Sequence, residues 1–203
     1  MPEFDDVPVR LAIFISGRGS NMKTLVEACL AGDIPARPIL ILSNKYSAEG
    51  LEWATENGLP IAAIDHRAYD GDREAFEKDV QETLEMHDVE FIALAGFMRV
   101  LTPWFTEKWE GRMVNIHPSL LPKYPGLHTH KRAIEAGDKE AGCSVHWVTE
   151  GVDEGAVIDR ETVPIKEGDT PESLAERVLE REHILYPRAL NKAIEDFLDR
   201  EEG

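Results

Sequence analysis

Val7 to Ile15 reads Val-Pro-Val-Arg-Leu-Ala-Ile-Phe-Ile, and Ser-Gly-Arg-Gly-Ser-Asn follows directly at residues 16–21. The first run is almost continuously apolar, which predicts a strand buried on both faces. Apolar residues then recur at helical spacing and predict a helix with Ser20 as its N-cap: Met22, Leu25, Val26, Cys29 and Leu30. A strand, a glycine turn and a helix in this order point free backbone N–H groups at an anion. A phosphate site and a purely structural turn both fit the segment.

The same alternation continues outward from this segment. The sequence predicts strands at 37–42, 60–64 and 89–95 and helices at 48–56 and 73–86. Strands that alternate with helices indicate a Rossmann-like, doubly wound α/β fold with a mostly parallel sheet. Such sheets bind ligands at the carboxyl ends of their strands. The glycine turn, residues 96–99 and residues 115–117 should therefore meet at one cleft.

The pattern changes after a predicted helix at 129–135. Two β-rich segments, 142–148 and 157–165, are separated by an acidic loop that contains glycine. We expect them to form an added antiparallel pair at one side of the sheet. A last helical pattern spans 170–198, and Pro187 should either bend it or divide it into two helices.

Charge and composition exclude several classes of function. The 203 residues include 22 basic and 39 acidic ones, which gives a net charge of −17. A non-specific nucleic-acid or anionic-membrane binder needs a basic surface, so neither partner is expected. The sequence shows no signal-peptide pattern and no apolar run near the ~20 residues of a membrane helix. We therefore expect a cytoplasmic protein, with Cys29 and Cys143 in its core.

An amide side chain and an imidazole side chain lie close together at the end of a further predicted strand. Residues 113–117 read Met-Val-Asn-Ile-His, so Asn115 and His117 project on the same strand face. Pro118 cannot continue the ladder and ends the strand. Two such polar groups can also be satisfied core residues with no chemical role.

The segment that follows favours a catalytic role for these two residues. Residues 115–130 read Asn-Ile-His-Pro-Ser-Leu-Leu-Pro-Lys-Tyr-Pro-Gly-Leu-His-Thr-His, and this string resembles the catalytic segment of the glycinamide ribonucleotide formyltransferases. The resemblance to this folate-dependent formyltransferase family runs from about Arg10 to Pro187. It implies transfer of a formyl group from 10-formyltetrahydrofolate to the amine of 5'-phosphoribosylglycinamide in de novo purine biosynthesis, without a metal.

The resemblance also implies catalytic roles. Asn115 should donate to the oxyanion, and His117 should manage protons beside the carboxylate of Asp153 in the loop at 149–155. Glu150 and Glu154 are the alternatives for that carboxylate. We expect the carboxylate to raise the pKa of His117 enough to keep the imidazole protonated near neutrality.

Binding residues follow from the same resemblance. The implied ribonucleotide site comprises Gly19, Ser20, Asn21, Met22, Lys23 and Glu182, the last in a Glu-His-x-x-Tyr-Pro string. The implied folate site comprises Arg73, Met98, Arg99, Val100, Leu101, Asn115, Thr149, Glu150, Gly151, Val152 and Asp153. A metal site at His128, His130 and His146 is not expected, because no carboxylate or cysteine has matching spacing.

We expect residues 1–203 to form one domain, with a phosphate-binding half at about 7–100 and a catalytic and folate-binding half at about 101–198. It should act on two small molecules as a monomer or homodimer. Methionyl-tRNA formyltransferase and formyltetrahydrofolate deformylase share the Asn-x-His pattern, but each would need a further domain. A non-catalytic nucleotide-binding module is the alternative from another class, and Ser43-Asn44-Lys45 stands where its ribose-binding acid would be.

Overall fold

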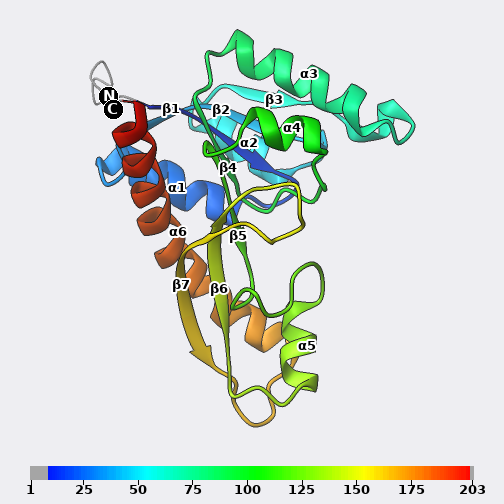
Figure 1. Cartoon of the computed structure of the whole chain (residues 1–203), viewed down its shortest axis with the longest axis vertical. Coiled ribbons are helices and arrows are strands. Elements are labelled where there is room, and N and C mark those ends of the chain that lie inside the picture. The colour runs from blue at the N-terminus through cyan, green and yellow to red at the C-terminus, as the bar shows by residue number, and fades with distance from the viewer. Residues whose placement is uncertain (1–8, 202–203) are drawn as a thin grey trace.

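β1 (Val9–Ile15) lies inside a seven-stranded sheet in the computed structural model, which describes residues 9–201 (Figure 1). Leu11 and Ile13 pack into one hydrophobic cluster, and Ala12 and Phe14 pack into a second cluster. Alternate side chains of a strand point to opposite faces, so both faces of β1 are buried, as its apolar run predicts. Val7, where the predicted strand begins, lies outside the described residues.

The sheet has the order β3-β2-β1-β4-β5-β6-β7. The other strands are β2 (Ala36–Ser43), β3 (Ile61–Ala63), β4 (Phe91–Leu94), β5 (Met113–His117), β6 (Glu140–Trp147) and β7 (Val157–Pro164). The first five strands in this order pair in parallel, whereas β5–β6 and β6–β7 are antiparallel. The predicted α/β class and the added antiparallel pair are both confirmed.

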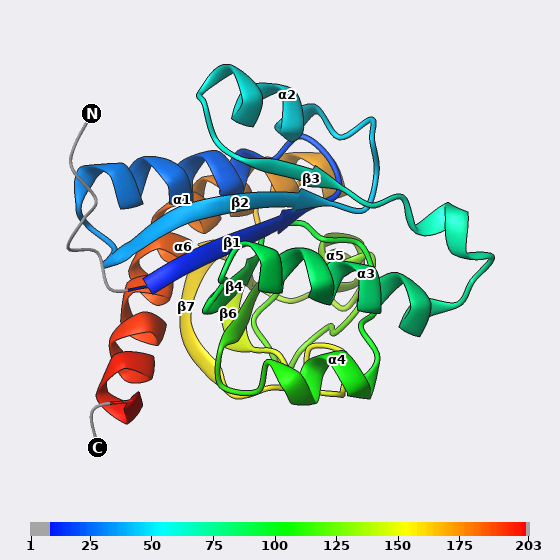
Figure 2. The same cartoon turned by 90° about the horizontal axis from the view of Figure 1, so that it is seen from above.

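Helices cover both faces of the sheet, as the view from above shows (Figure 2). One cluster joins the sheet to α1 (Ser20–Ala31), α2 (Glu49–Glu56) and α6 (Pro171–Glu201). The other joins it to α3 (Arg73–Met86) and α4 (Pro103–Lys108), and α5 (Thr129–Glu135) follows the loop after β5. The sequence analysis missed α4 and the 3-10 helix at His66–Tyr69, because both are too short to show a period.

Two local predictions need correction or completion. Gly19, not Ser20, is the N-cap of α1; it has a φ of 70° and no side chain caps the helix. Ser20 is the first helical residue, because the left-handed backbone at Gly19 turns the chain one residue earlier. Pro187 lies inside α6, which continues through it as one helix.

The fold brings three motifs to one edge of the sheet. The backbone N–H of Ser16, after β1, donates to the carbonyl of Gly96, after β4, at 3.1 Å. Leu94 at the end of β4 pairs with Asn115 on β5. The carboxyl ends of β1, β4 and β5 therefore lie side by side, where parallel sheets bind ligands.

Candidate active site

Asn115 and His117 occupy the end of β5, and a carboxylate faces the histidine. Nδ1 of His117 lies 3.2 Å from Oδ2 of Asp153, and the two side chains are only 7% and 10% exposed. Asp153 comes from the loop between β6 and β7, far along the chain. The sheet topology brings the strand end and this loop together, which produces a buried imidazole–carboxylate pair.

Asp153 has a second partner that fixes its loop. The backbone N–H of Gly126 donates to Oδ2 of Asp153 at 2.9 Å, and Asp153 has a φ of 56°. The two other candidate carboxylates, Glu150 and Glu154, are exposed, and neither forms an ion pair with a histidine in the described part of the chain. Of the three acids in this loop, Asp153 is the one in contact with His117.

His146 is a site residue that the sequence analysis placed only near the pocket. It pairs with Asn115 across the antiparallel β5–β6 ladder, and it is 2% exposed. Its Nε2 lies 3.3 Å from the Asn115 amide nitrogen and 3.4 Å from Oδ1 of Asp153. Nδ1 lies 2.8 Å from the carbonyl of Trp147, so both ring nitrogens of His146 have polar neighbours. The pairing of β5 with β6 identifies His146 as a site residue, and sequence spacing alone does not reveal this pairing.

The charge state of His117 differs from the expectation. Burial is the strongest influence and lowers the pKa of His117, while the Tyr124 carbonyl and the Asp153 carboxylate oppose it; the pKa lies below its ordinary value. The prediction that the carboxylate outweighs burial is therefore wrong. Burial raises the pKa of Asp153, but contacts with His146, Gly126 and His117 together bring it below its ordinary value. A neutral imidazole thus faces an ionised carboxylate.

Both ring nitrogens of His117 have acceptors nearby. Nε2 lies 2.9 Å from the carbonyl of Tyr124, a residue with a φ of 55°. The neutral ring has one N–H for the two acceptors, and protonation would satisfy both. His117 must release one of these contacts before that nitrogen can meet a substrate atom.

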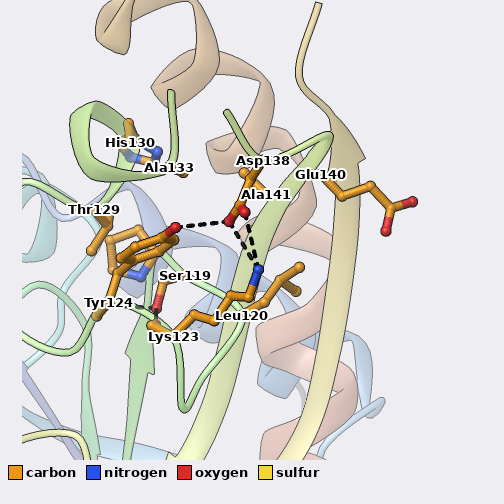
Figure 3. Close-up of a pocket in the computed structure, with 11 residues that line it drawn as sticks. Ser119, Leu120, Lys123, Tyr124, Thr129, His130, Ala133, Asp138, Glu140 and Ala141 are labelled. Atoms are coloured by element: carbon orange, nitrogen blue, oxygen red, sulfur yellow. Dashed lines mark hydrogen bonds and ion pairs between the residues drawn. The ribbon is translucent and has the colours of Figure 1, made fainter. Parts of the chain in front are cut away.

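The loop that carries Tyr124 is anchored at its outer side. Figure 3 shows Tyr124 and Lys123 pointing toward Asp138, and all three side chains line a small pocket. The Tyr124 hydroxyl donates to Asp138 at 2.8 Å, and Lys123 Nζ lies 3.0 Å from the same carboxylate. The Arg132 guanidinium stacks 5.1 Å from the Tyr124 ring. These contacts stabilise the left-handed backbone that presents the carbonyl to His117.

The ribonucleotide-binding candidates gather at the start of α1. Asn21 Nδ2 donates to Oε2 of the buried Glu182 at 2.7 Å, which joins α1 to α6. Asn21 Oδ1 is buried and has no hydrogen-bond partner in the described part of the chain. Ser20 and Met22 belong to the first turn, where N–H groups lack intrahelical partners, and Lys23 Nζ lies 5.5 Å from the centre of the Trp53 ring. The structure therefore places all six candidates around one helix start.

The folate-binding candidates come from three segments. Arg73 begins α3, Met98 to Leu101 form the loop between β4 and α4, and Thr149 to Asp153 form the loop after β6. Three apolar side chains on these loops remain largely exposed: Met98 at 65%, Val100 at 51% and Val152 at 47%. Val148, next to the acidic loop, packs against the cluster that contains Leu101. Asp153, at the end of the acidic loop, also contacts His117 and His146, and His146 is the strand partner of Asn115.

Among residues 9–201, His, Cys, Asp and Glu side chains form no group of three or more that could hold a metal ion. None of the helices in this range is both long and apolar enough to cross a membrane.

Comparison with known proteins identifies the class. A family model described as formyl transferase matches residues 9–190, and the chain belongs to this family. Phosphoribosylglycinamide formyltransferase of Escherichia coli is 42% identical over 183 residues, which cover 90% of this chain and 86% of the relative. Its counterpart from Haemophilus influenzae is 43% identical, covering 88% and 84%. Within the family, the relatives of which the chain covers most of the length are these phosphoribosylglycinamide formyltransferases.

Solved structures agree with this assignment. Glycinamide ribonucleotide transformylase 1 from Symbiobacterium toebii superimposes with a TM-score of 0.87 at 42% identity and covers 90% of this chain and 86% of that one. Phosphoribosylglycinamide formyltransferase from Brucella melitensis gives 0.85 at 47%, covering 91% and 94%. The trifunctional purine biosynthetic protein adenosine-3 of Drosophila melanogaster is 49% identical over 89% of this chain, which spans 14% of that longer protein.

Proposed function

We propose that the site formed by Asn115, His117 and Asp153 transfers a formyl group from 10-formyltetrahydrofolate to the amine of 5'-phosphoribosylglycinamide. The 3.2 Å contact between His117 and Asp153, beside Asn115, carries the proposal. It unites an amide donor, a neutral proton acceptor and an ionised carboxylate at the ligand-binding edge of the sheet.

Each residue has a defined task in this reaction. The substrate amine attacks the formyl carbon, a C–N bond forms, and the carbonyl oxygen becomes an oxyanion that Asn115 stabilises by N–H donation. The neutral His117 takes the proton that the amine loses, and Asp153 stabilises the resulting imidazolium. The proton then passes to N10 of the folate as the C–N10 bond breaks, which gives formylglycinamide ribonucleotide and tetrahydrofolate.

Different features of the structure favour the binding of each substrate. The uncapped N-terminus of α1 and the unpaired Asn21 Oδ1 favour a phosphorylated ligand with a polar N–H near Glu182. The exposed apolar side chains of Met98, Val100 and Val152 favour a flat, largely apolar ligand on the folate side. We propose that a single domain of residues 1–203 binds both molecules in the cytoplasm, as a monomer or homodimer.

Substrate-dependent kinetics test the proposal. Absorbance change from tetrahydrofolate release should require both 10-formyltetrahydrofolate and glycinamide ribonucleotide. Release of tetrahydrofolate and formate without the ribonucleotide would indicate a hydrolase instead. Binding of nucleotide without turnover of either substrate would indicate a non-catalytic module.

A further inference from the structure

Glu77 is a buried carboxyl group that the proposed reaction does not use. It lies on α3 between the core residues Phe76 and Val80 and is 1% exposed. A buried carboxylate is costly unless strong hydrogen bonds compensate for the lost water. Both of its oxygens do have donors: Oε1 accepts the backbone N–H of Thr102 at 2.8 Å, and Oε2 accepts the Thr102 hydroxyl.

Thr102 is the point where the loop after β4 enters α4. It is the N-cap of α4, yet its side chain makes no capping hydrogen bond to that helix. Its N–H and its hydroxyl both go to Glu77. The contact therefore ties the end of the loop to α3.

The other end of this loop has its own anchor. The backbone N–H of Met98 donates to Oγ of Ser16 at 2.7 Å, and Ser16 donates to Oδ1 of the buried Asn44 at 2.5 Å. The segment Met98–Leu101 is thus held at its start by Ser16 and, through the adjacent Thr102, at its end by Glu77. Its exposed side chains, Met98 and Val100, lie between the two anchors.

Glu77 also lies beside the second folate-binding element. Arg73 precedes it by four residues on α3, the spacing at which helical side chains are neighbours. Burial raises the pKa of Glu77, while the hydrogen bonds from Thr102 and the positive charge of Arg73 oppose that rise. One carboxyl group consequently interacts with both Arg73 and the end of the loop.

We propose that Glu77 is a positioning residue that sets the loop Met98–Leu101 and Arg73 in the geometry that binds the folate. The inference rests on the proposed folate site. Because Glu77 contacts neither the ribonucleotide candidates nor Asn115 and His117, its loss should affect one substrate and spare the other.

Two substitutions attack the contact from opposite sides. Glu77→Gln keeps the size of the side chain but presents an NH2 group to one Thr102 donor, and Thr102→Val keeps the shape but removes the hydroxyl. Each should raise the KM for 10-formyltetrahydrofolate roughly tenfold, the scale of a lost hydrogen bond to a charged group. The KM for glycinamide ribonucleotide and kcat should stay within about twofold, well below that scale.

Thr106→Val is the matched control. Thr106 lies on the same helix and is 3% exposed, but its hydroxyl bonds only the nearby carbonyls of Thr102 and Pro103. The control should leave both KM values unchanged, and the combined Glu77→Gln/Thr102→Val protein should lose less than the product of the single effects. If Glu77→Gln does not fold, the KM of Thr102→Val for 10-formyltetrahydrofolate tests the proposal in its place.

A second comparison separates this inference from the folate site itself. Val100→Asp alters the loop surface directly and should raise the KM for the folate. An unchanged folate KM in both Glu77→Gln and Thr102→Val, with a raised value in Val100→Asp, would reject the role of Glu77 alone. An unchanged value in all three would reject the folate site as well. Parallel increases in both KM values would reduce Glu77 to a general structural residue and overturn the proposal.

Discussion

His117 on β5 and Asp153 in the loop after β6 lie within 3.2 Å, although 36 positions separate them in the numbering (153 − 117). β6 runs antiparallel to β5 and ends beside Val114, and the loop after β6 folds back so that Asp153 reaches His117. The pair is buried, so its interaction is screened less by water and salt than a surface ion pair. This relationship underlies the first two predictions.

Loss of either catalytic side chain should lower turnover more than affinity. Asn115→Ala removes the oxyanion donor and His117→Ala removes the proton acceptor, and each should reduce kcat on the order of 100-fold or more. Steady-state kinetics should show KM values close to those of the unmodified protein. Near-normal turnover in either purified variant would remove that residue from the mechanism.

Asp153→Asn should lower the pKa of His117 further. The carboxylate is one of the influences that oppose burial, so its neutralisation leaves burial less balanced. The imidazolium formed during transfer loses its counter-charge, and kcat should fall with little change in KM. NMR titration of His117 in both proteins measures the shift. An unchanged or higher pKa would leave Asp153 with a role in shaping the loop only.

Gly19→Ala should destabilise the protein and weaken ribonucleotide binding. Gly19 has a φ of 70°, and a Cβ there would lie 3.2 Å from the backbone Cα of Gly50 and 2.8 Å from the Met22 methyl. The left-handed backbone alone costs about 1 kcal/mol for alanine. Thermal unfolding and the KM for each substrate should show a lower Tm and a raised KM for the ribonucleotide alone.

Gly17→Ala is the control for that prediction, because a Cβ at Gly17 meets nothing within 4 Å. It should keep the Tm of the unmodified protein. A collapse of folate affinity in Gly19→Ala, with an unchanged ribonucleotide KM, would mean that the two substrate sites are assigned the wrong way round.

Acidification should destabilise the fold through three histidines, of which one is buried and two are half-buried. Burial lowers the pKa of His117, His130 and His183 in the folded protein. At a pH between the folded and the unfolded pKa values, the unfolded chain therefore binds more protons than the folded one. Their contribution to stability is present above about pH 6.5 and is lost as the pH falls through the lowered folded values. Urea unfolding from pH 8 to pH 5.5 should show this decline.

Replacement of one such histidine should reduce the pH slope. His130→Gln removes a half-buried ring whose buried Nδ1 has no hydrogen-bond partner among residues 9–201. His128→Asn is the control, since His128 is exposed and Asn tolerates its left-handed backbone. An equal slope in His130→Gln and in the unmodified protein would contradict the assignment of His130.

Local patterns were sufficient for the order of the longer elements and for the polar pair at the end of β5, but not for the short α4 and the 3-10 helix at His66–Tyr69. Every β1 residue that the two hydrophobic clusters bury is apolar. The composition of this strand therefore predicts that it belongs to a parallel sheet and is buried on both faces. The alternation of Asn115 and His117 on one strand face follows from the period of a strand. The resemblance of the segment after them supplied the family, and the comparisons confirm it.

Tertiary structure decided what depends on neighbours distant in sequence. His146 reaches Asn115 only through the β5–β6 register, and Glu77 meets Thr102 only because α3 packs beside the loop after β4. The charge of His117 depends on how much water the fold excludes, and burial there outweighs the nearby carboxylate. Spacing along a chain records which side chains share an element, whereas desolvation and pairing between elements arise only when the sheet and its helices have assembled.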